Sequence, residues 1–123
     1  MSNSGPSEEE LSPIISFLSA GKFDEALKKV TTLSQKYPSE SLLINICGIC
    51  YQGLGKLENA VKYYRNAIKI DPSYYKAHFN LGGAYQILGM QNNAIKSFKT
   101  TLSLNPDYVE AHNNIGSLYK ELN

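Results

Sequence analysis

The chain has 123 residues, and its 12 lysine and arginine residues against 11 aspartate and glutamate residues give a formal net charge of +1 at pH 7. This length is enough for one domain with a continuous hydrophobic core. The balanced charge provides no long-range attraction to nucleic acid or to an anionic membrane, and no apolar run approaches the roughly 18 residues of a spanning helix. The two cysteines, Cys47 and Cys50, lie too close together to close a useful loop, which favours a reducing compartment. We therefore expect a cytoplasmic protein.

The N-terminal segment divides into a tail and a helix start. Residues 1–6 are small and polar, and we expect a disordered tail there. Ser7 and Glu10 have the spacing of a capping box, which predicts that the first helix begins at this point. Pro13 leaves an alternative, because it removes a backbone donor and would suit a helix whose cap is Ser12.

Three residue types then recur at one interval of 34 residues. The recurring positions are Gly21, Gly55 and Gly89, Ala26, Ala60 and Ala94, and Pro38, Pro72 and Pro106. A fixed period of 20 to 50 residues indicates a repeat architecture. Each glycine is expected to end a helix with a positive φ, and each proline to follow the end of the next helix. Apolar spacing then predicts further helices at about 23–36, 41–54, 57–70, 75–88, 91–104 and 108–122.

This pattern of small, aromatic and proline positions resembles the tetratricopeptide repeat family. The resemblance implies an all-α, right-handed solenoid of antiparallel helix pairs, with repeats at 7–40, 41–74 and 75–108 and a half repeat at 109–123. It departs from the family at the tryptophan position, which is filled by Ile44, His78 and His112. The first repeat is also atypical, because Pro13, Ile14 and Phe17 stand in place of the usual leucine, glycine and tyrosine.

Members of this family generally bind extended peptides in the concave groove formed by the first helix of each pair. By register, the groove residues implied here are Asn45, Ile49, Gln52, Lys76, Phe79, Asn80, Gln86, Asn113, Asn114 and Ser117. Asn80 and Asn114 are similar to the asparagine ladder in the repeats that precede the protein O-GlcNAc transferase domain, but Ile46 interrupts that ladder in the second repeat. The carboxylate clamp of co-chaperone repeats is not matched, since only Lys76 is placed for it. Recognition of chaperone C-termini is therefore disfavoured.

Three other patterns are explained by packing or solvent exposure, without a redox, metal-binding or nucleic-acid-binding role. Cys47 and Cys50 form a CxxC spacing inside an expected helix, where we interpret them as core thiols and not as a redox pair. His78 and His112 occupy the family's tryptophan position, which favours helix packing over a metal pair. A lysine stripe at Lys28, Lys62 and Lys96 follows from the repeat period, and we interpret it as a solvated outer face.

The sequence thus predicts a non-catalytic interaction scaffold, with no cofactor, whose partner is a protein or peptide and not nucleic acid or a membrane. One alternative is the N-terminal targeting arm of a longer enzyme, of sulfotransferase, glycosyltransferase or oxygenase type. Another is a self-assembly module, because Ile115 and Tyr119 on the last helix lack the helix that would follow in a complete repeat. Weak self-association through this helix is therefore an expectation.

Overall fold

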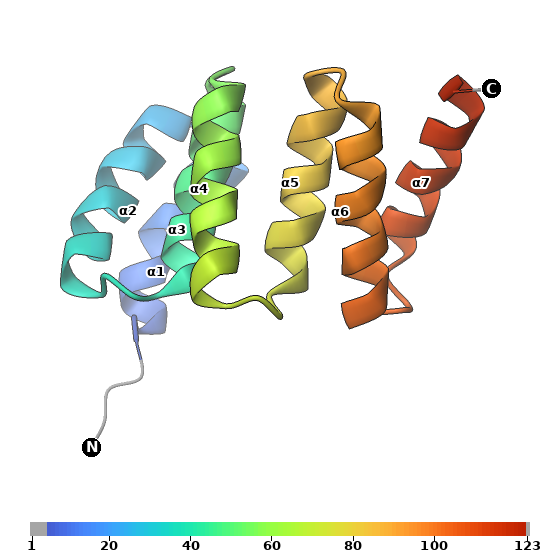
Figure 1. Cartoon of the computed structure of the whole chain (residues 1–123). Helices are drawn as coiled ribbons and strands as arrows, with labels where there is room; N and C mark the ends of the chain where they lie inside the picture. Colours follow the sequence, from blue (N-terminus) through green and yellow to red (C-terminus); the bar gives the residue numbers. More distant parts are fainter. Residues whose placement is uncertain (1–4, 123) are drawn as a thin grey trace.

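The computed structural model describes residues 5–122, and within this range the secondary structure is entirely helical. Seven helices follow one another across the molecule in chain order (Figure 1). Their bounds are α1 Glu8–Ser19, α2 Phe23–Lys36, α3 Ser41–Gly53, α4 Leu57–Ile70, α5 Tyr75–Ile87, α6 Gln91–Leu104 and α7 Val109–Leu122. Each bound lies within one residue of the range that the repeat pattern predicts. The predicted tail at 1–6 falls largely outside the described residues.

The start of α1 confirms the capping box. The Glu10 backbone N–H donates to the Ser7 hydroxyl at 3.0 Å, and the Ser7 backbone N–H donates to Glu10 Oε1 at 2.9 Å. The helix continues through Pro13 to Ser19, so the alternative start at Ser12 is wrong. Two backbone donors that a helix end leaves without partners are satisfied in this way.

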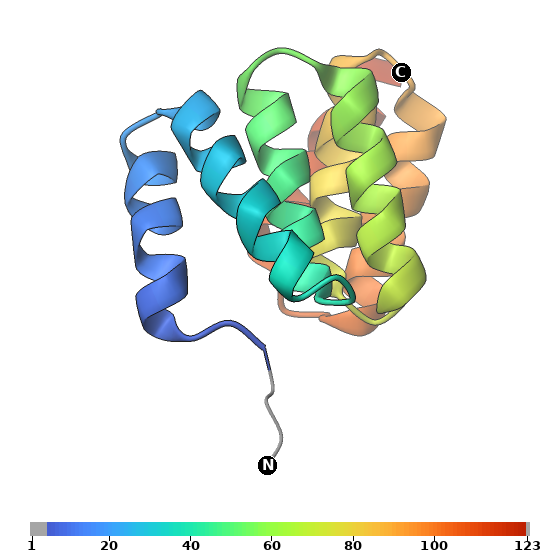
Figure 2. The same ribbon diagram turned by 90° about the vertical axis from the view of Figure 1, so that its left-hand side faces the viewer.

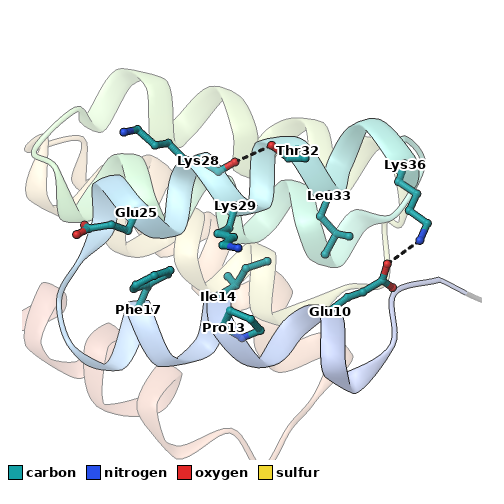
Figure 3. Close-up of a pocket in the computed structure, with 10 residues that line it drawn as sticks. All are labelled: Glu10, Pro13, Ile14, Phe17, Glu25, Lys28, Lys29, Thr32, Leu33 and Lys36. Atoms are coloured by element: carbon teal, nitrogen blue, oxygen red, sulfur yellow. Dashed lines mark hydrogen bonds and ion pairs between the residues drawn. The ribbon is translucent and has the colours of Figure 1, made fainter.

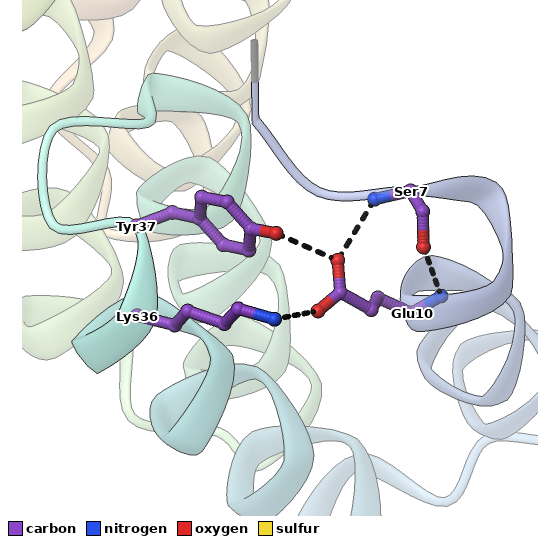
Figure 4. Close-up of polar contacts among 4 residues, drawn as sticks. All are labelled: Ser7, Glu10, Lys36 and Tyr37. Carbon is purple, nitrogen blue, oxygen red and sulfur yellow. Dashed lines mark hydrogen bonds and ion pairs between the residues drawn. The ribbon is translucent and has the colours of Figure 1, made fainter. Parts of the chain in front are cut away.

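Glu10 also fastens α1 to the end of α2 (Figure 4). Its Oε2 accepts from the Lys36 ammonium at 2.8 Å, and its Oε1 accepts from the Tyr37 hydroxyl at 2.9 Å. The hydrogen bond from Lys36 is the main cause that lowers the pKa of the Glu10 carboxyl to about 2, with the capping bond from Ser7 next. One carboxylate therefore caps one helix and holds its neighbour.

The turn inside each helix pair has the same construction. Gly21, Gly55 and Gly89 have φ values of 72°, 79° and 80°, as predicted. The residue after each glycine donates its N–H back to the carbonyl five residues earlier, for example Lys56 to Tyr51 at 2.8 Å. This is a Schellman arrangement, and glycine adopts its left-handed conformation without a Cβ penalty.

Small residues let the two helices of a pair approach closely. A Cβ added to Gly48 would lie 2.5 Å from the Tyr64 ring, and one added to Gly82 would lie 2.7 Å from the Phe98 ring. Both rings are at most 1% exposed. At Gly116, the equivalent position of α7, a Cβ would meet nothing within 4 Å. Within the described residues, no aromatic ring packs against Gly116 in the way that Tyr64 packs against Gly48 and Phe98 against Gly82.

The core runs through the stack as two adjoining clusters. One joins α1, α2 and α3 and includes Ile14, Val30 and Leu43; the other joins α4 to α7 and is built around Tyr64 and Phe98. Viewed from the end formed by α1 and α2, the later helices lie behind them (Figure 2). None of the helices at residues 5–122 combines the length and the apolar character that a membrane crossing requires.

Candidate functional site: the pocket between α3 and α5

A hollow in the predicted groove, here called the α3–α5 pocket, has a volume of about 370 Å³. Side chains from four consecutive helices meet in it. Its lining consists of Phe23, Ile49, Gln52, Gly53, Tyr64 and Asn80. The predicted residues Ile49, Gln52 and Asn80 are therefore brought together, although Asn80 is separated from the other two by a whole helix.

Two hydrogen bonds orient the amide groups of this pocket. The Tyr64 hydroxyl donates to Gln52 Oε1 at 2.7 Å. Asn80 Nδ2 donates to Asn45 Oδ1 at 3.1 Å, and Asn45 Nδ2 in turn donates to the Tyr74 hydroxyl at 3.4 Å. Burial raises the pKa of Tyr64, so its hydroxyl stays protonated as a donor at neutral pH. Within residues 5–122, no side-chain hydrogen bond uses Gln52 Nε2 or Asn80 Oδ1. The first atom is therefore a free donor and the second a free acceptor.

Phe23 supplies the apolar wall of the pocket, and the groove register did not predict it. It is the first residue of α2 and lies against α3, where a Cβ on Gly53 would come within 2.5 Å of its ring. The lack of a side chain at Gly53 is the one sequence signal that points to such a close approach. Ile49, partly buried, contributes a second apolar surface.

Asn45 differs from its predicted role. Its side chain is 3% exposed, so it does not face a ligand; it holds Asn80 and Tyr74 in place. Ile46 is also in the core, at 6% exposure. The second repeat therefore supports the asparagine of the third repeat from within, and does not extend the asparagine ladder.

The remaining predicted groove residues lie outside the pocket. Phe79 is half-buried and packs against the rings of Phe98 and Tyr108, with centroid separations of 5.5 and 5.1 Å. The others divide into exposed side chains, at Lys76, Asn113 and Ser117, and half-buried ones, at Gln86 and Asn114. These five residues are not part of the lining of the α3–α5 pocket.

The structure supports the packing interpretation of the cysteines. Cys47 and Cys50 are free and buried, and burial raises the pKa of the Cys50 thiol to about 11. A thiol with such a pKa is protonated at neutral pH and is a poor nucleophile. Within residues 5–122, no cluster of three or more His, Cys, Asp or Glu side chains has the arrangement of a metal site.

The histidines have a more specific role than helix packing. His78 Nε2–H donates to the Pro72 carbonyl at 2.9 Å, and His112 Nε2–H donates to the Pro106 carbonyl at 2.8 Å. His112 is also exposed. Both rings therefore fix the proline loop that precedes their own helix, at equivalent places in two repeats.

A second hollow lies between α1 and α2 (Figure 3). Ile14, Phe17 and Leu33 point into it, and the Lys36–Glu10 ion pair closes one end. In the next helix pair, the equivalent of Phe17 is Tyr51, which forms part of a hollow with residues of the preceding α2. Phe17 and Tyr51 therefore border hollows at equivalent positions of the first and second pairs.

Comparison with known proteins agrees with the helical repeat fold. A model of the TPR repeat matches residues 50–89 and 84–123. Comparison with curated protein sequences gives no significant match. Among solved structures, the first TPR of Spaghetti (RPAP3) bound to the HSP90 peptide SRMEEVD superposes with a TM-score of 0.88, at 26% identity over 92% of both chains.

Two further structures are similar. The second TPR domain of human RPAP3, in complex with the HSP70 peptide SGPTIEEVD, is 29% identical over 89% of this chain and 92% of its own, with a TM-score of 0.82. The Sgt2 TPR domain from Aspergillus fumigatus shares the fold, with a TM-score of 0.88 and 16% identity over 96% of this chain and 82% of its own. Because the repeat model matches more than half of the chain, the protein belongs to the tetratricopeptide repeat (TPR) family.

Proposed function

We propose that the chain is a non-catalytic scaffold that binds a peptide segment of a partner protein in the α3–α5 pocket. The observation that carries this proposal is the pair of free amide atoms, Gln52 Nε2 and Asn80 Oδ1, held beside the apolar wall of Phe23 and Ile49. A peptide backbone presents a carbonyl acceptor and an N–H donor, which are the complements of these two atoms. The apolar wall adds contact area for one aliphatic side chain of the peptide.

The pocket is pre-organised for this task. Gln52 is held by the buried Tyr64 hydroxyl, and Asn80 is held by the buried Asn45 amide. Side chains that are already fixed lose less conformational entropy when a ligand binds. The RPAP3 TPR domains that were solved with bound peptides support peptide binding by a domain of this fold.

The chemistry of the pocket favours backbone recognition over capture of a C-terminal carboxylate. Its lining contains no lysine or arginine, and Lys76, on α5, is not part of it. Binding of this kind selects an extended backbone and one apolar side chain, not a terminal charge. The lack of a cation in the pocket is consistent with the sequence-based expectation that chaperone C-termini are not the ligand.

Affinity measurements on single variants test the proposal. Peptides selected from a displayed library against the chain would be titrated into wild type, Asn80→Ala and Gln52→Ala. Each substitution should weaken binding by about 0.5 to 1.5 kcal/mol, the usual contribution of one hydrogen bond. Asn59→Ala, an exposed amide on α4, is the matched control and should leave the affinity unchanged.

Chemical-shift mapping with the same peptides gives a separate check. Perturbed amides should cluster around Ile49, Gln52 and Asn80. Perturbations confined to the exposed residues of α4 and α6, or an Asn80→Ala variant that binds as tightly as wild type, would show that the pocket is not the binding site.

A further inference from the structure

The near-zero net charge conceals a separation of charge between the two sets of helices. The second helices of the pairs, α2, α4 and α6, carry eight lysine and arginine residues against three acidic ones. The helices α1, α3, α5 and α7 carry two basic residues against five acidic ones. The outer layer is therefore basic, although the whole chain has a charge of only +1.

Three of these eight basic residues lie at a hollow between α4 and α5, here called the outer groove, with a volume of about 610 Å³. Its apolar lining comes from Val61, Ile68 and Leu81, which are buried or half-buried. Its rim carries Lys62, Arg65 and Lys69, all exposed. The groove thus combines an apolar floor with three cations along one face of α4.

Among residues 5–122, these three cations form no salt bridge. The ion pair that residues 5–122 do form joins Glu10 to Lys36, far from α4 along the chain. Glu58, the one acidic residue in the lining, forms no salt bridge with them. The rim charges therefore remain available to an incoming ligand.

The other two outer helices lack this concentration of charge. The positions equivalent to Lys62, Arg65 and Lys69 are Lys28, Thr31 and Gln35 on α2, and Lys96, Lys99 and Ser103 on α6. The repeat period accounts for the lysine that all three helices share. It does not account for the three successive cations on α4.

We propose that the outer groove docks an acidic amphipathic helix of a partner protein. The cations at 62, 65 and 69 repeat at about one helical turn, or roughly 5 to 6 Å along the α4 axis. Carboxylates at i and i+4 of a second helix have the same repeat, and its apolar residues would then lie over Val61, Ile68 and Leu81. The Arg65 guanidinium can bind a carboxylate through two parallel hydrogen bonds.

The lining argues against nucleic acid as the ligand. Proteins that bind single strands stack successive bases on aromatic side chains, and the lining contains no Phe, Tyr or Trp. Its one ring, His78, is held by the bond to the Pro72 carbonyl. An apolar floor also has nothing to contact on a phosphate backbone, whereas it suits leucine or isoleucine side chains.

The test uses a synthetic helical peptide of about 16 residues, with glutamates at i, i+4 and i+8 and leucines on the adjacent face. Titration calorimetry should show binding to the intact chain that falls at least tenfold in Lys62→Glu/Lys69→Glu. The control Lys76→Glu/Lys120→Glu makes the same change in net charge on α5 and α7, and should alter affinity less than twofold. Asn80→Ala should also bind normally, which separates this surface from the α3–α5 pocket.

Three results would each overturn the proposal. The first is equal binding of a peptide in which every glutamate is glutamine. The second is equal loss of affinity in both double variants, which would indicate a nonspecific charge effect. The third is tighter binding of a single-stranded DNA of about 20 nucleotides than of the acidic peptide. All four substituted lysines are exposed, so each variant should keep the fold. Circular dichroism of each variant checks this.

Discussion

At the scale of single residues, glycine has two different uses in the helix pairs, and Gly82 and Gly116 separate them. Gly82 is buried, and its missing side chain makes room for the Phe98 ring. Gly116 occupies the equivalent position on α7 but faces open space. The same residue type in the same register therefore has a packing role in one repeat and none in the other.

This difference predicts opposite effects of one substitution. Gly82→Ala should lower the stability by about 1 kcal/mol or more, because the cost of overpacking against a buried ring exceeds the gain in helix propensity. Gly116→Ala should raise the stability by about 0.5 to 1 kcal/mol. Urea unfolding at low protein concentration measures both changes. A stabilised Gly82→Ala variant would show that α5 and α6 can move apart at little cost.

At the scale of elements, the attachment of α1 to α2 depends on the ionised carboxylate of Glu10. The pKa of this group is about 2 in the folded chain and near 4.5 in an unpaired carboxyl. Because the folded value is the lower one, the contribution is complete above about pH 4.5 and is lost as the pH falls toward 2. The unfolded chain binds the proton first in this interval, which lowers the stability of the folded state.

Glu10→Gln should therefore flatten the dependence of stability on pH between about 4.5 and 2. Glutamine retains the size of the side chain but has no charge to titrate. Glu9→Gln, an exposed neighbour outside the ion pair, is the control and should keep the slope of wild type. Thermal unfolding across this pH range provides the measurement, and equal slopes for wild type and Glu10→Gln would contradict the assignment.

At the scale of the whole molecule, the two ends of the stack differ from its interior. At the α7 end, Tyr119 is 43% exposed and lies three residues from Gly116, on the same side of the helix. Tyr64 and Phe98 show that the glycine position in this register accepts an aromatic ring. Two antiparallel copies of α7 would place Tyr119 of each copy over Gly116 of the other, as a two-fold contact requires.

We therefore expect weak dimerisation of the 123-residue chain through α7. A single helix face buries less area than a standard stable interface, so the dimer should form only at high concentration. Tyr119→Glu should abolish it, whereas Ile87→Glu, which places a charge at another exposed apolar site, should not. Light scattering over a range of concentrations measures the mass. A monomer at millimolar concentration, or a dimer that survives Tyr119→Glu, would refute this arrangement.

The sequence by itself determined the helix pairs and their order. The capping box at Ser7 and the glycine turns depend on residues that are close together in the chain, so local backbone chemistry is sufficient to predict them. The 34-residue period repeats these local signals and so gives the order of the helix pairs. It also predicted Gln52, Asn80 and Ile49 as neighbours in a groove, because helices in register align equivalent positions. The structure confirms the helices and turns, and it places these three side chains around one pocket.

Only the tertiary structure decided how the side chains of different repeats use one another. Asn45 and Asn80 were both predicted to face a ligand, yet Asn45 is buried, where its Oδ1 accepts from Asn80 Nδ2 and its Nδ2 donates to the Tyr74 hydroxyl. Phe23 lines the pocket because Gly53 leaves room for its ring. Lys62, Arg65 and Lys69 border a groove because Leu81 of the next helix completes its floor. The physical reason is that repeat register specifies which positions are equivalent, while burial and hydrogen-bond pairing depend on the particular side chain that each neighbouring helix brings into contact.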